Sequence, residues 1–336
     1  MPQTVLLTGG AGYIGSHTCV ALSEAGFDVV ILDDFSNAKA DVIDRLKTGL
    51  GVRSLTCYEG SVLDAALLRK IFANHDISAV VHFAAKKAVG ESVDQPLMYF
   101  QTNIGGLLTL LDAMDHAQVR SLVFSSSATV YGDTDIIPTP EEAPRSPTSP
   151  YGYTKTTSEE ILLRLQDSQP WAFGILRYFN PVGAHDSGLI GEDPQGIPNN
   201  LMPYIAQVAE GRRSELQVFG NDYPTRDGTG ERDYIHVCDL ARGHVLSVQK
   251  LLETGQGHLV NLGTGQAYSV LEVLAEYSKT VGRDLPYKIV PRRAGDVSAY
   301  LADVTKAREV LGFETELGLP EMCQSSWHWM EQQAKR

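Results

Sequence analysis

Cysteine is scarce in this chain of 336 residues, which contains only four. Cys19, Cys57, Cys238 and Cys323 lie far apart and form no Cys-x-x-Cys pair. This spacing argues against a zinc motif and a disulfide framework. His82 has no second histidine or carboxylate at ligand spacing, so we interpret it as structural and expect no metal site. Free thiols are typical of a reducing compartment.

Positive charge and long apolar runs are also lacking. Lys and Arg together number 28 against 41 acidic residues, which gives a formal net charge of −13. Such a charge argues against nucleic acid or an anionic membrane as a main partner. No apolar run approaches the length of a membrane span. Because Met1 leads almost directly into the first expected strand, we expect no signal peptide and a cytoplasmic protein.

The first 180 residues contain an alternation of short apolar runs and helical patterns. Buried strands that alternate with helices predict an α/β fold, a Rossmann-type doubly wound parallel sheet covered on both faces. We assign residues 1–180 to this domain. The expected strands are 4–8, 28–32, 54–58, 79–83, 122–125 and 172–178, and the expected helices are 17–25, 40–46, 65–73, 97–117 and 151–166.

Residues 181–336 have a different texture and predict a smaller mixed α/β domain. A stretch rich in glycine and proline, 181–203, indicates an ordered ligand loop. Either of two later strands, 233–237 and 259–262, could rejoin the first sheet, so the boundary near residue 180 is approximate. The expected helices of this part are 201–210, 240–252, 270–281, 305–311 and 320–333.

A glycine loop joins the first expected strand to the first helix. Gly9, Gly12 and Gly15 have Gly-x-x-Gly-x-x-Gly spacing, which lets backbone and a helix N-terminus approach a pyrophosphate. Asp33 ends the second strand, where its carboxylate can accept a bond from a ribose 2′-hydroxyl and repel a 2′-phosphate. The loop and the acid together predict NAD rather than NADP, although a structural glycine turn is the alternative.

Three serines and a Tyr-x-x-x-Lys pair supply the candidate chemistry. Tyr151 and Lys155 are four residues apart, so they share one face of a helix that Ser149-Pro150 would begin. A lysine beside a phenol favours the phenolate, which makes Tyr151 a candidate base. An isolated match of this kind is more often an exposed helix pair. Here Ser125-Ser126-Ser127 ends a buried strand, at the edge where ligands bind in open α/β sheets.

Together these residues resemble the extended short-chain dehydrogenases/reductases, and the chain is similar to the UDP-glucose 4-epimerase family along nearly its whole length. The resemblance implies tightly bound NAD and a Tyr151 that deprotonates the 4-hydroxyl of the hexose. Ser127 would share that proton, although a serine at a strand end is often only a cap. The matching stretches are 82–84, 87–92, 125–132, 176–184, 191–201 and 228–237.

The resemblance also implies the binding residues. For NAD they are Gly9, Gly12, Tyr13, Ile14, Gly15, Asp33, Asn37, Ser61, Val62, Phe83, Ala84, Ala85, Lys87, Asn103, Ser125, Tyr151, Lys155, Tyr178 and Phe179. For the UDP-hexose they are Lys87, Ser127, Tyr151, Phe179, Asn180, Asn199, Asn200, Leu201, Phe219, Arg232, Arg293, Asp296 and Tyr300. A guanidinium fork suits a diphosphate, yet taken singly each arginine is more often a surface charge, and Lys87 a loop lysine.

The sequence departs from the family pattern at a few positions. Ser61 stands where an acidic residue is usual, Thr102 where an asparagine is usual, and Ala85 where glycine is frequent. These changes bear on the adenine and ribose contacts. Tyr300 lines the hexose pocket by the same resemblance, and its bulk leaves little room for a 2-acetamido group. We therefore expect UDP-glucose and UDP-galactose as substrates.

Four alternatives compete with this interpretation. A UDP-N-acetylglucosamine epimerase or an NAD-dependent nucleotide-sugar dehydrogenase would use the same machinery. A 4,6-dehydratase would need an acid pair, which the stretch Ser127-Ala128-Thr129 lacks. A non-catalytic dinucleotide sensor would have little reason to keep Ser127, Tyr151 and Lys155. The family pairs helices 97–117 and 151–166 across a twofold axis, so we expect a homodimer, although burial within one chain gives the same apolar faces.

Overall fold

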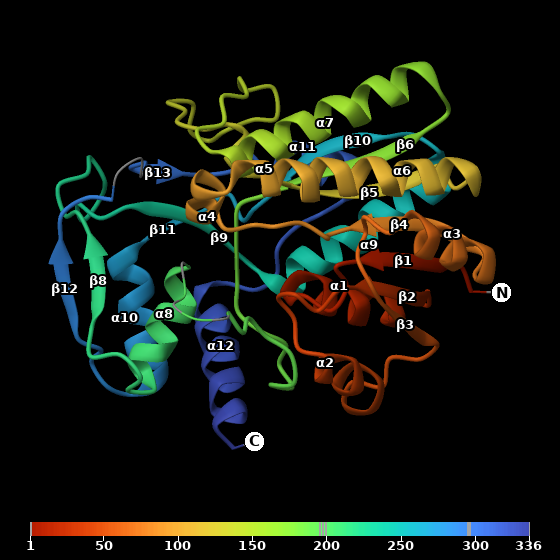
Figure 1. Cartoon of the computed structure of the whole chain (residues 1–336). Coiled ribbons are helices and arrows are strands. Elements are labelled where there is room, and N and C mark those ends of the chain that lie inside the picture. Colours follow the sequence, from red (N-terminus) through yellow and green to blue (C-terminus); the bar gives the residue numbers. More distant parts are fainter. Residues whose placement is uncertain (1, 195, 197, 199, 294–296, 336) are drawn as a thin grey trace.

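Seven parallel strands form the central sheet of the computed structural model, which describes residues 2–194, 196, 198, 200–293 and 297–335. The sheet confirms the Rossmann-type fold, and Figure 1 shows it beside the smaller C-terminal elements. Across the sheet, the strands are β10 (His258–Leu262), β6 (Ala172–Tyr178), β5 (Ser121–Ser127), β4 (Ile77–His82), β1 (Thr4–Thr8), β2 (Asp28–Asp33) and β3 (Leu55–Glu59).

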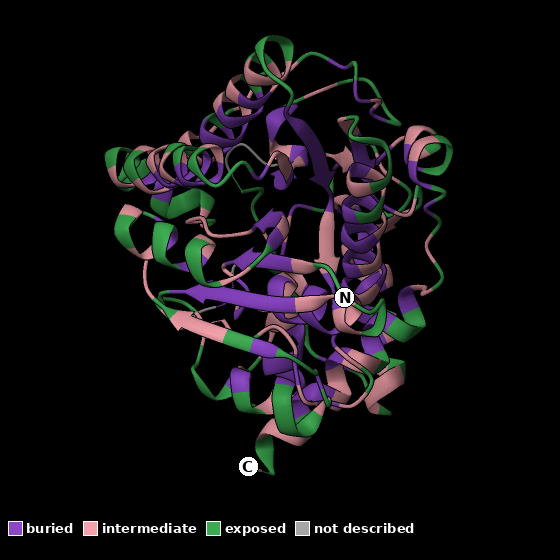
Figure 2. Ribbon diagram, turned by 90° about the vertical axis from the view of Figure 1, so that its right-hand side faces the viewer, coloured by how far each residue is buried: buried purple, intermediate pink, exposed green. Residues whose placement is uncertain are grey.

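Two apolar clusters lie on opposite faces of this sheet because successive residues of a strand point to opposite sides. Val5 and Leu7 of β1 pack with α1 (Tyr13–Glu24) and α9 (Val237–Thr254), whereas Leu6 packs with α3 (Ala65–Asn74), α6 (Gly106–His116) and α7 (Pro150–Ser168). Apart from the edge strand β3, the strands are accordingly buried along most of their length (Figure 2). Burial on both faces explains why their sequences read as continuous apolar runs.

The helix expected over 97–117 is built from three pieces. A short helix, α5 (Pro96–Tyr99), runs into a π-helical turn (Phe100–Gly105), which continues into α6. A further short helix, α4 (Val89–Asp94), precedes them. π-helical turns inside helices often occur at functional sites, and this one contains Asn103.

Some boundaries differ from those expected. Helix α1 begins at Tyr13 rather than at residue 17, because Gly12 of the loop already serves as its N-cap. The strand expected over 122–125 extends through all three serines to Ser127. The segment expected near 40–46 is a one-turn helix, α2 (Asp41–Asp44), followed by a π-helical turn (Arg45–Gly49).

The C-terminal elements form two smaller sheets. In one, β9 (Glu231–His236) pairs with β7 (Asn180–Val182), β11 (Ala267–Ser269) and β13 (Ala299–Tyr300); in the other, β8 (Leu216–Phe219) pairs with β12 (Tyr287–Val290). Of the two strands that could rejoin the first sheet, β10 does so, whereas β9 stays in the smaller sheet. The helices here are α8 (Leu201–Ala209), α10 (Val270–Val281), α11 (Thr305–Leu311) and α12 (Leu319–Ala334).

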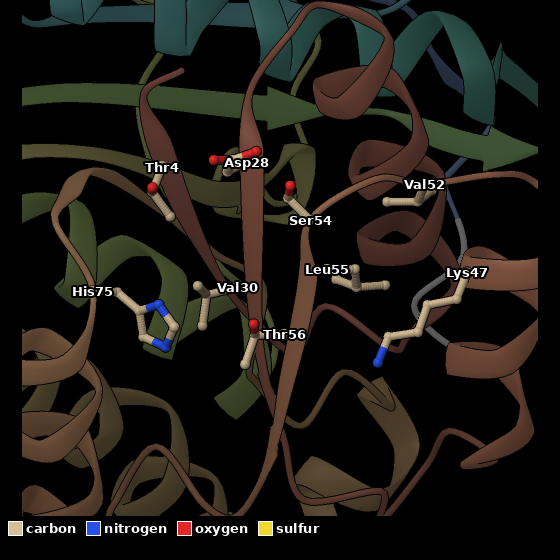
Figure 3. A pocket seen from close by; sticks show the side chains of 9 residues that line it. All are labelled: Thr4, Asp28, Val30, Lys47, Val52, Ser54, Leu55, Thr56 and His75. Atoms are coloured by element: carbon tan, nitrogen blue, oxygen red, sulfur yellow. The ribbon is translucent and has the colours of Figure 1, made fainter. Parts of the chain in front are cut away.

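A cleft of about 530 Å³ opens at the edge of the sheet where its strands begin. Thr4, Asp28 and Leu55 are the first residues of β1, β2 and β3 and line this cleft (Figure 3). Ligands bind at the carboxyl ends of the strands in folds of this type. The cleft lies at the opposite edge of the sheet and is therefore not expected to be the ligand site. Among the residues that the structure describes, no helix is both long and apolar enough to cross a bilayer.

Candidate active site

The predicted cofactor residues follow the carboxyl ends of six neighbouring strands. The glycine loop follows β1, and Asn37 follows β2 after Asp33. Ser61 and Val62 come after β3, residues 83–87 after β4, and Phe179 after β6. Ser125 lies near the carboxyl end of β5. Because parallel strands end at one edge of the sheet, the topology brings these distant segments together.

Close packing shapes the glycine loop. Gly9 has a positive φ of 73°, and a Cβ there would lie 2.7 Å from the backbone nitrogen of Ala84. A Cβ on Gly15 would lie 2.4 Å from the carbonyl oxygen of Gly9. Without side chains at these glycines, the loop leaves room for an anion to approach the start of α1, whose unpaired N–H groups attract negative charge. This cradle fits the pyrophosphate of a dinucleotide.

Asp33 fixes the glycine loop to the end of β2. Its carboxylate accepts hydrogen bonds from the backbone N–H of Ala11 and of Phe35, each at 2.9 Å. Burial raises the pKa of Asp33, and these hydrogen bonds partly offset that effect. A carboxylate oxygen has more than one lone pair, so Asp33 retains acceptor capacity for a ribose hydroxyl.

Strand β5 and helix α7 carry the Ser-Tyr-Lys group. The Ser149 side chain accepts a bond from Gly152 N–H at 3.1 Å, and Pro150 occupies the first turn, which confirms the expected start of the helix. The Ser127 side chain lies beside the Tyr151 phenol and lowers its pKa. The Lys155 ammonium donates to the Ser125 carbonyl oxygen at 2.5 Å and lies 5.9 Å from the centroid of the Tyr151 ring.

Burial dominates the ionisation of this group. It raises the pKa of Tyr151 to about 12, against a smaller lowering by the Ser127 side chain. It also lowers the pKa of Lys155 to about 8, although Glu159 acts in the opposite direction. Among the protein groups alone, desolvation therefore outweighs the effect expected of the Lys155 charge on the pKa of Tyr151. A further positive charge beside the phenol is needed to bring its pKa toward neutrality.

Asn103 connects the loop after β4 to the catalytic helix. Its side-chain oxygen accepts from Lys86 N–H at 2.8 Å, and its amide nitrogen donates to the Lys86 carbonyl oxygen at 2.9 Å and to Thr154 Oγ1 at 3.1 Å. Asn103 and Thr154 are both buried. The π-helical turn that presents Asn103 therefore positions residues 84–87 against α7.

Glu192 joins several predicted ligand residues. Its carboxylate lies 3.7 Å from the Lys87 ammonium and accepts a bond from the Asn200 amide at 2.8 Å. Burial raises the pKa of Glu192, whereas Lys87 lowers it. Nearby, the Tyr13 hydroxyl donates to the Gly183 carbonyl oxygen at 2.7 Å. Gly183, Glu192 and Asn200 are thereby attached to the cofactor side of the molecule.

Tyr300 closes the site from the smaller sheet. Its hydroxyl lies 2.8 Å from the carbonyl oxygens of both Ala128 and Gly132, and its ring centroid is 5.7 Å from that of Phe179. Tyr300 and Arg232 are register partners on β13 and β9. These contacts place Tyr300 and Phe179 beside the segment that follows Ser127.

Phe219 and Arg293 form a second group at the β8–β12 sheet. The Arg293 guanidinium carbon lies 4.4 Å from the centroid of the Phe219 ring. The remaining predicted contacts occupy other element ends: Asn180 begins β7 and Leu201 begins α8, while Ile14 lies in the first turn of α1. Asn199 and Asp296 lie outside the described residues.

The sequence of this chain is similar to those of known proteins. The pattern of the GDP-mannose 4,6 dehydratase family matches residues 6–326. A UDP-glucose 4-epimerase of Yersinia pestis is 57% identical, over 97% of this chain and 96% of the relative. The chain belongs to the UDP-glucose 4-epimerase family. A UDP-glucose 4-epimerase of Bacillus subtilis is 52% identical over 97% of this chain and 96% of the relative.

Solved structures of this epimerase family share the fold. The enzyme from Stenotrophomonas maltophila, with bound NAD and formylated UDP-arabinopyranose, has a TM-score of 0.97 and 48% identity, covering 99% of each chain. The Bifidobacterium longum enzyme in complex with NAD⁺ and UDP has a TM-score of 0.94 and 47% identity, also covering 99% of each chain.

The sequence did not assign a role to three carboxylates around the site, which are buried or nearly so. Glu192 lies in the matching stretch 191–201, but no role was predicted for it. Asp233 accepts bonds from the backbone N–H groups of Thr264, Gly265 and Ala302, and so holds together the loops beside β13. Glu159 lies under the three serines. Each acid lies among other polar residues, so no local signal marks it, and partners such as Ser126, Lys87 and Thr264 are remote in sequence.

Proposed function

We propose that the protein is an NAD-dependent UDP-glucose 4-epimerase that interconverts UDP-galactose and UDP-glucose. The observation that carries this proposal is that Ser127 and buried Lys155 both lie beside Tyr151, at the strand edge that also holds the glycine loop. The high identity to named epimerases over nearly the whole chain supports the same activity.

The roles follow from the positions of the side chains. Tyr151 takes the proton of the 4-hydroxyl, and Ser127, which lies beside Tyr151, shares it. Lys155 supplies positive charge near the phenol and is held by the Ser125 carbonyl oxygen. NAD⁺, when bound, supplies the acceptor that takes hydride from C4 and returns it to either face of the 4-keto sugar. On return, Tyr151 gives back the proton, so the reaction involves no net oxidation.

A nucleotide such as UDP would be anchored away from the reacting carbon. Arg232 lies on β9 and Phe219 on β8, while Arg293 follows β12 and packs on the Phe219 ring; guanidinium groups suit a diphosphate. Asn180 begins β7, and Asn200 and Leu201 lie at the start of α8. Firm anchoring there leaves the hexose free to present both faces to the site, as inversion requires.

The alternatives are weaker on specific grounds. The matched family takes its description from a 4,6-dehydratase, but Ser127 is followed by Ala128 and Thr129 rather than by an acid pair. Thr129 instead donates its hydroxyl to Ser127 Oγ at 3.0 Å. A UDP-N-acetylglucosamine epimerase would need space that the Tyr300 ring, tied to two backbone carbonyls, occupies.

We further infer a cytoplasmic homodimer. Leu97, Leu108 and Tyr153 are each about half exposed or more, at 66%, 48% and 58%. They lie on α5, α6 and α7, and α5 lies against α7. A second copy of these helices would cover the apolar side chains. Light scattering of the purified protein would test this, and a monomeric mass at micromolar concentration would contradict it.

The test of the activity is incubation of the purified protein with UDP-galactose, without added NAD. Chromatography would follow the sugar nucleotides, and absorbance would follow reduced nicotinamide. We expect conversion to UDP-glucose with no accumulation of reduced cofactor. Stoichiometric reduction that requires added NAD would instead indicate a dehydrogenase, and the absence of any reaction would contradict both.

A further inference from the structure

Three consecutive residues of β5 lie against three consecutive turns of α7. Residues 151, 155 and 159 are spaced by four and so face the same side of the helix. Tyr151 lies beside Ser127, which lowers its pKa, and Lys155 donates to the Ser125 carbonyl oxygen. The third contact comes from Glu159, whose carboxylate accepts the Ser126 hydroxyl at 2.5 Å.

Glu159 also reaches the neighbouring strand. Arg177 of β6 is the register partner of Ser126 and donates to both carboxylate oxygens of Glu159, from Nε at 2.8 Å and from Nη2 at 2.6 Å. Glu159, Arg177 and Ser126 are exposed by 0%, 2% and 1%. One carboxylate therefore ties α7 to both β5 and β6. A charge-assisted bidentate pair gives such a tie a fixed geometry.

The same cluster supports the loop that follows Ser127. Arg177 Nη1 donates to the Tyr131 hydroxyl and to the Glu141 carbonyl oxygen, each at 2.9 Å. The Tyr131 hydroxyl in turn donates to the Asn261 side-chain oxygen at 2.6 Å. The position of Glu159 is thus determined from several directions, which suits a residue that must hold others in place.

We propose that Glu159 is a positioning residue for the catalytic pair. It keeps Tyr151 and Lys155 in register with Ser127 and Ser125, and it supplies the buried negative charge that the Lys155 ammonium faces. This inference rests on the proposed function for its kinetic consequences, but its structural basis is independent of the substrate.

Lys155 is surrounded by few charged groups. On its own helix it faces Tyr151 and Glu159, and Glu159 raises its pKa against the effect of burial. From β4 comes His82, whose pKa is lowered to about 3, first by burial and then by Lys155. From β5 come the Phe124 ring, 4.9 Å from the ammonium, and the Ser125 carbonyl, and from β6 comes Tyr178, bonded to the Ser125 hydroxyl.

The test compares Glu159→Gln with Glu160→Gln in the holoenzyme. Glutamine keeps an acceptor for Ser126 but removes the charge. Glu160 is the matched control, because it follows Glu159 directly and its own side chain is 61% exposed; it pairs with Arg145, which also lies 3.5 Å from the Glu159 carboxylate. We expect Glu159→Gln to move the alkaline limb of the kcat profile about one pH unit lower, at the low end of the effect of a nearby opposite charge. Glu160→Gln should retain the wild-type profile.

A second measurement does not depend on activity. The pH titration of the Lys155 side-chain carbon signal in ¹³C-lysine-labelled holoenzyme, assigned with Lys155→Met, should show the same downward shift in Glu159→Gln. Folded Glu159→Gln with an unchanged titration, or with activity reduced equally at every pH, would overturn the charge role. Wild-type protein that fails to epimerise would refute the proposed function while leaving this titration valid.

Ser126→Ala isolates the geometric role because it removes one tie and keeps the charge. We expect kcat to fall about tenfold, the effect of one buried hydrogen bond, with KM and the alkaline limb unchanged. Full activity would overturn the positioning role. Glu159→Gln could fail to fold because it leaves the buried Arg177 without its carboxylate partner. In that case the double variant Glu159→Gln/Arg177→Met removes both charges of the buried pair. It should shift the Lys155 titration in the same direction, and an unshifted titration would overturn the proposal.

Discussion

Replacing Gly15 by alanine should disturb the cofactor cradle. The new Cβ would lie 2.4 Å from the Gly9 carbonyl oxygen, and ordinary contact begins near 3.4 Å, so backbone must move by about 1 Å. The obstacle is the backbone of Gly9 and Gly10, in the loop that leads into α1, rather than a flexible side chain. Overpacking of this kind costs roughly 1–3 kcal/mol. If cofactor binding must correct the shift, this range corresponds to a loss of NAD affinity of about 5- to 150-fold.

The assay is the NAD content of the purified variant, followed by titration of NAD into protein stripped of cofactor. Thermal unfolding measured on the same samples separates loss of affinity from loss of fold. Gly90→Ala is the matched control, since a Cβ on this exposed glycine meets nothing within 4 Å. Wild-type NAD content and affinity in Gly15→Ala would refute the argument that close packing shapes this loop.

Three further predictions concern the catalytic base, the pocket and acid stability. Tyr151→Phe should lower kcat by about 10²- to 10⁴-fold with little change in KM, since it removes the proton-transfer group and keeps the ring; steady-state kinetics with UDP-galactose would show this, and a kcat near wild type would exclude Tyr151 as the base. Tyr300→Ser should raise kcat/KM for UDP-N-acetylgalactosamine relative to UDP-galactose, because it removes the ring beside Phe179; an unchanged ratio would mean that Tyr300 does not limit the pocket. Burial lowers the pKa of His17 and of His82 from 6.5 to about 3. Between these two pH values the two histidines are protonated in the unfolded chain and neutral in the folded chain. Below pH 6.5 each should therefore cost about 1.4 kcal/mol of unfolding free energy per pH unit until its folded pKa is reached. Urea unfolding at pH 7, 6 and 5 would measure this, with His82→Asn as the comparison, and a stability independent of pH over this range would contradict it.

The central sheet could be predicted because its strands are buried on both faces and their apolar character is local. The short strands β7, β8, β11, β12 and β13 could not, because each has two to four residues and depends on a partner far away in sequence. The same reason left open whether the segment near 259–262 joins the first sheet. The π-helical turn at Asn103 also escaped prediction, since its sequence fits an ordinary helix.

Local spacing likewise decided what could be predicted of the site. The glycine loop and the Tyr151–Lys155 pair each lie within a few residues. Glu159 could not be assigned in this way, since its contacts with Ser126 and Arg177 span 33 and 18 residues. The ionisation of Tyr151 also required the structure. The sequence shows that Lys155 is near, but only the fold shows how completely the phenol is removed from water.

Strand β10 has a consequence for any attempt to divide this protein. The chain leaves the central sheet after β6, builds part of the smaller sheets, and then returns to place β10 beside β6. A fragment that ended near residue 180 would leave β6, whose seven residues are all buried, as an open edge. Such an edge is a template for pairing with other chains. We therefore expect that fragment to aggregate during expression, and that a shorter version of the protein would have to carry residues 237–262 as well.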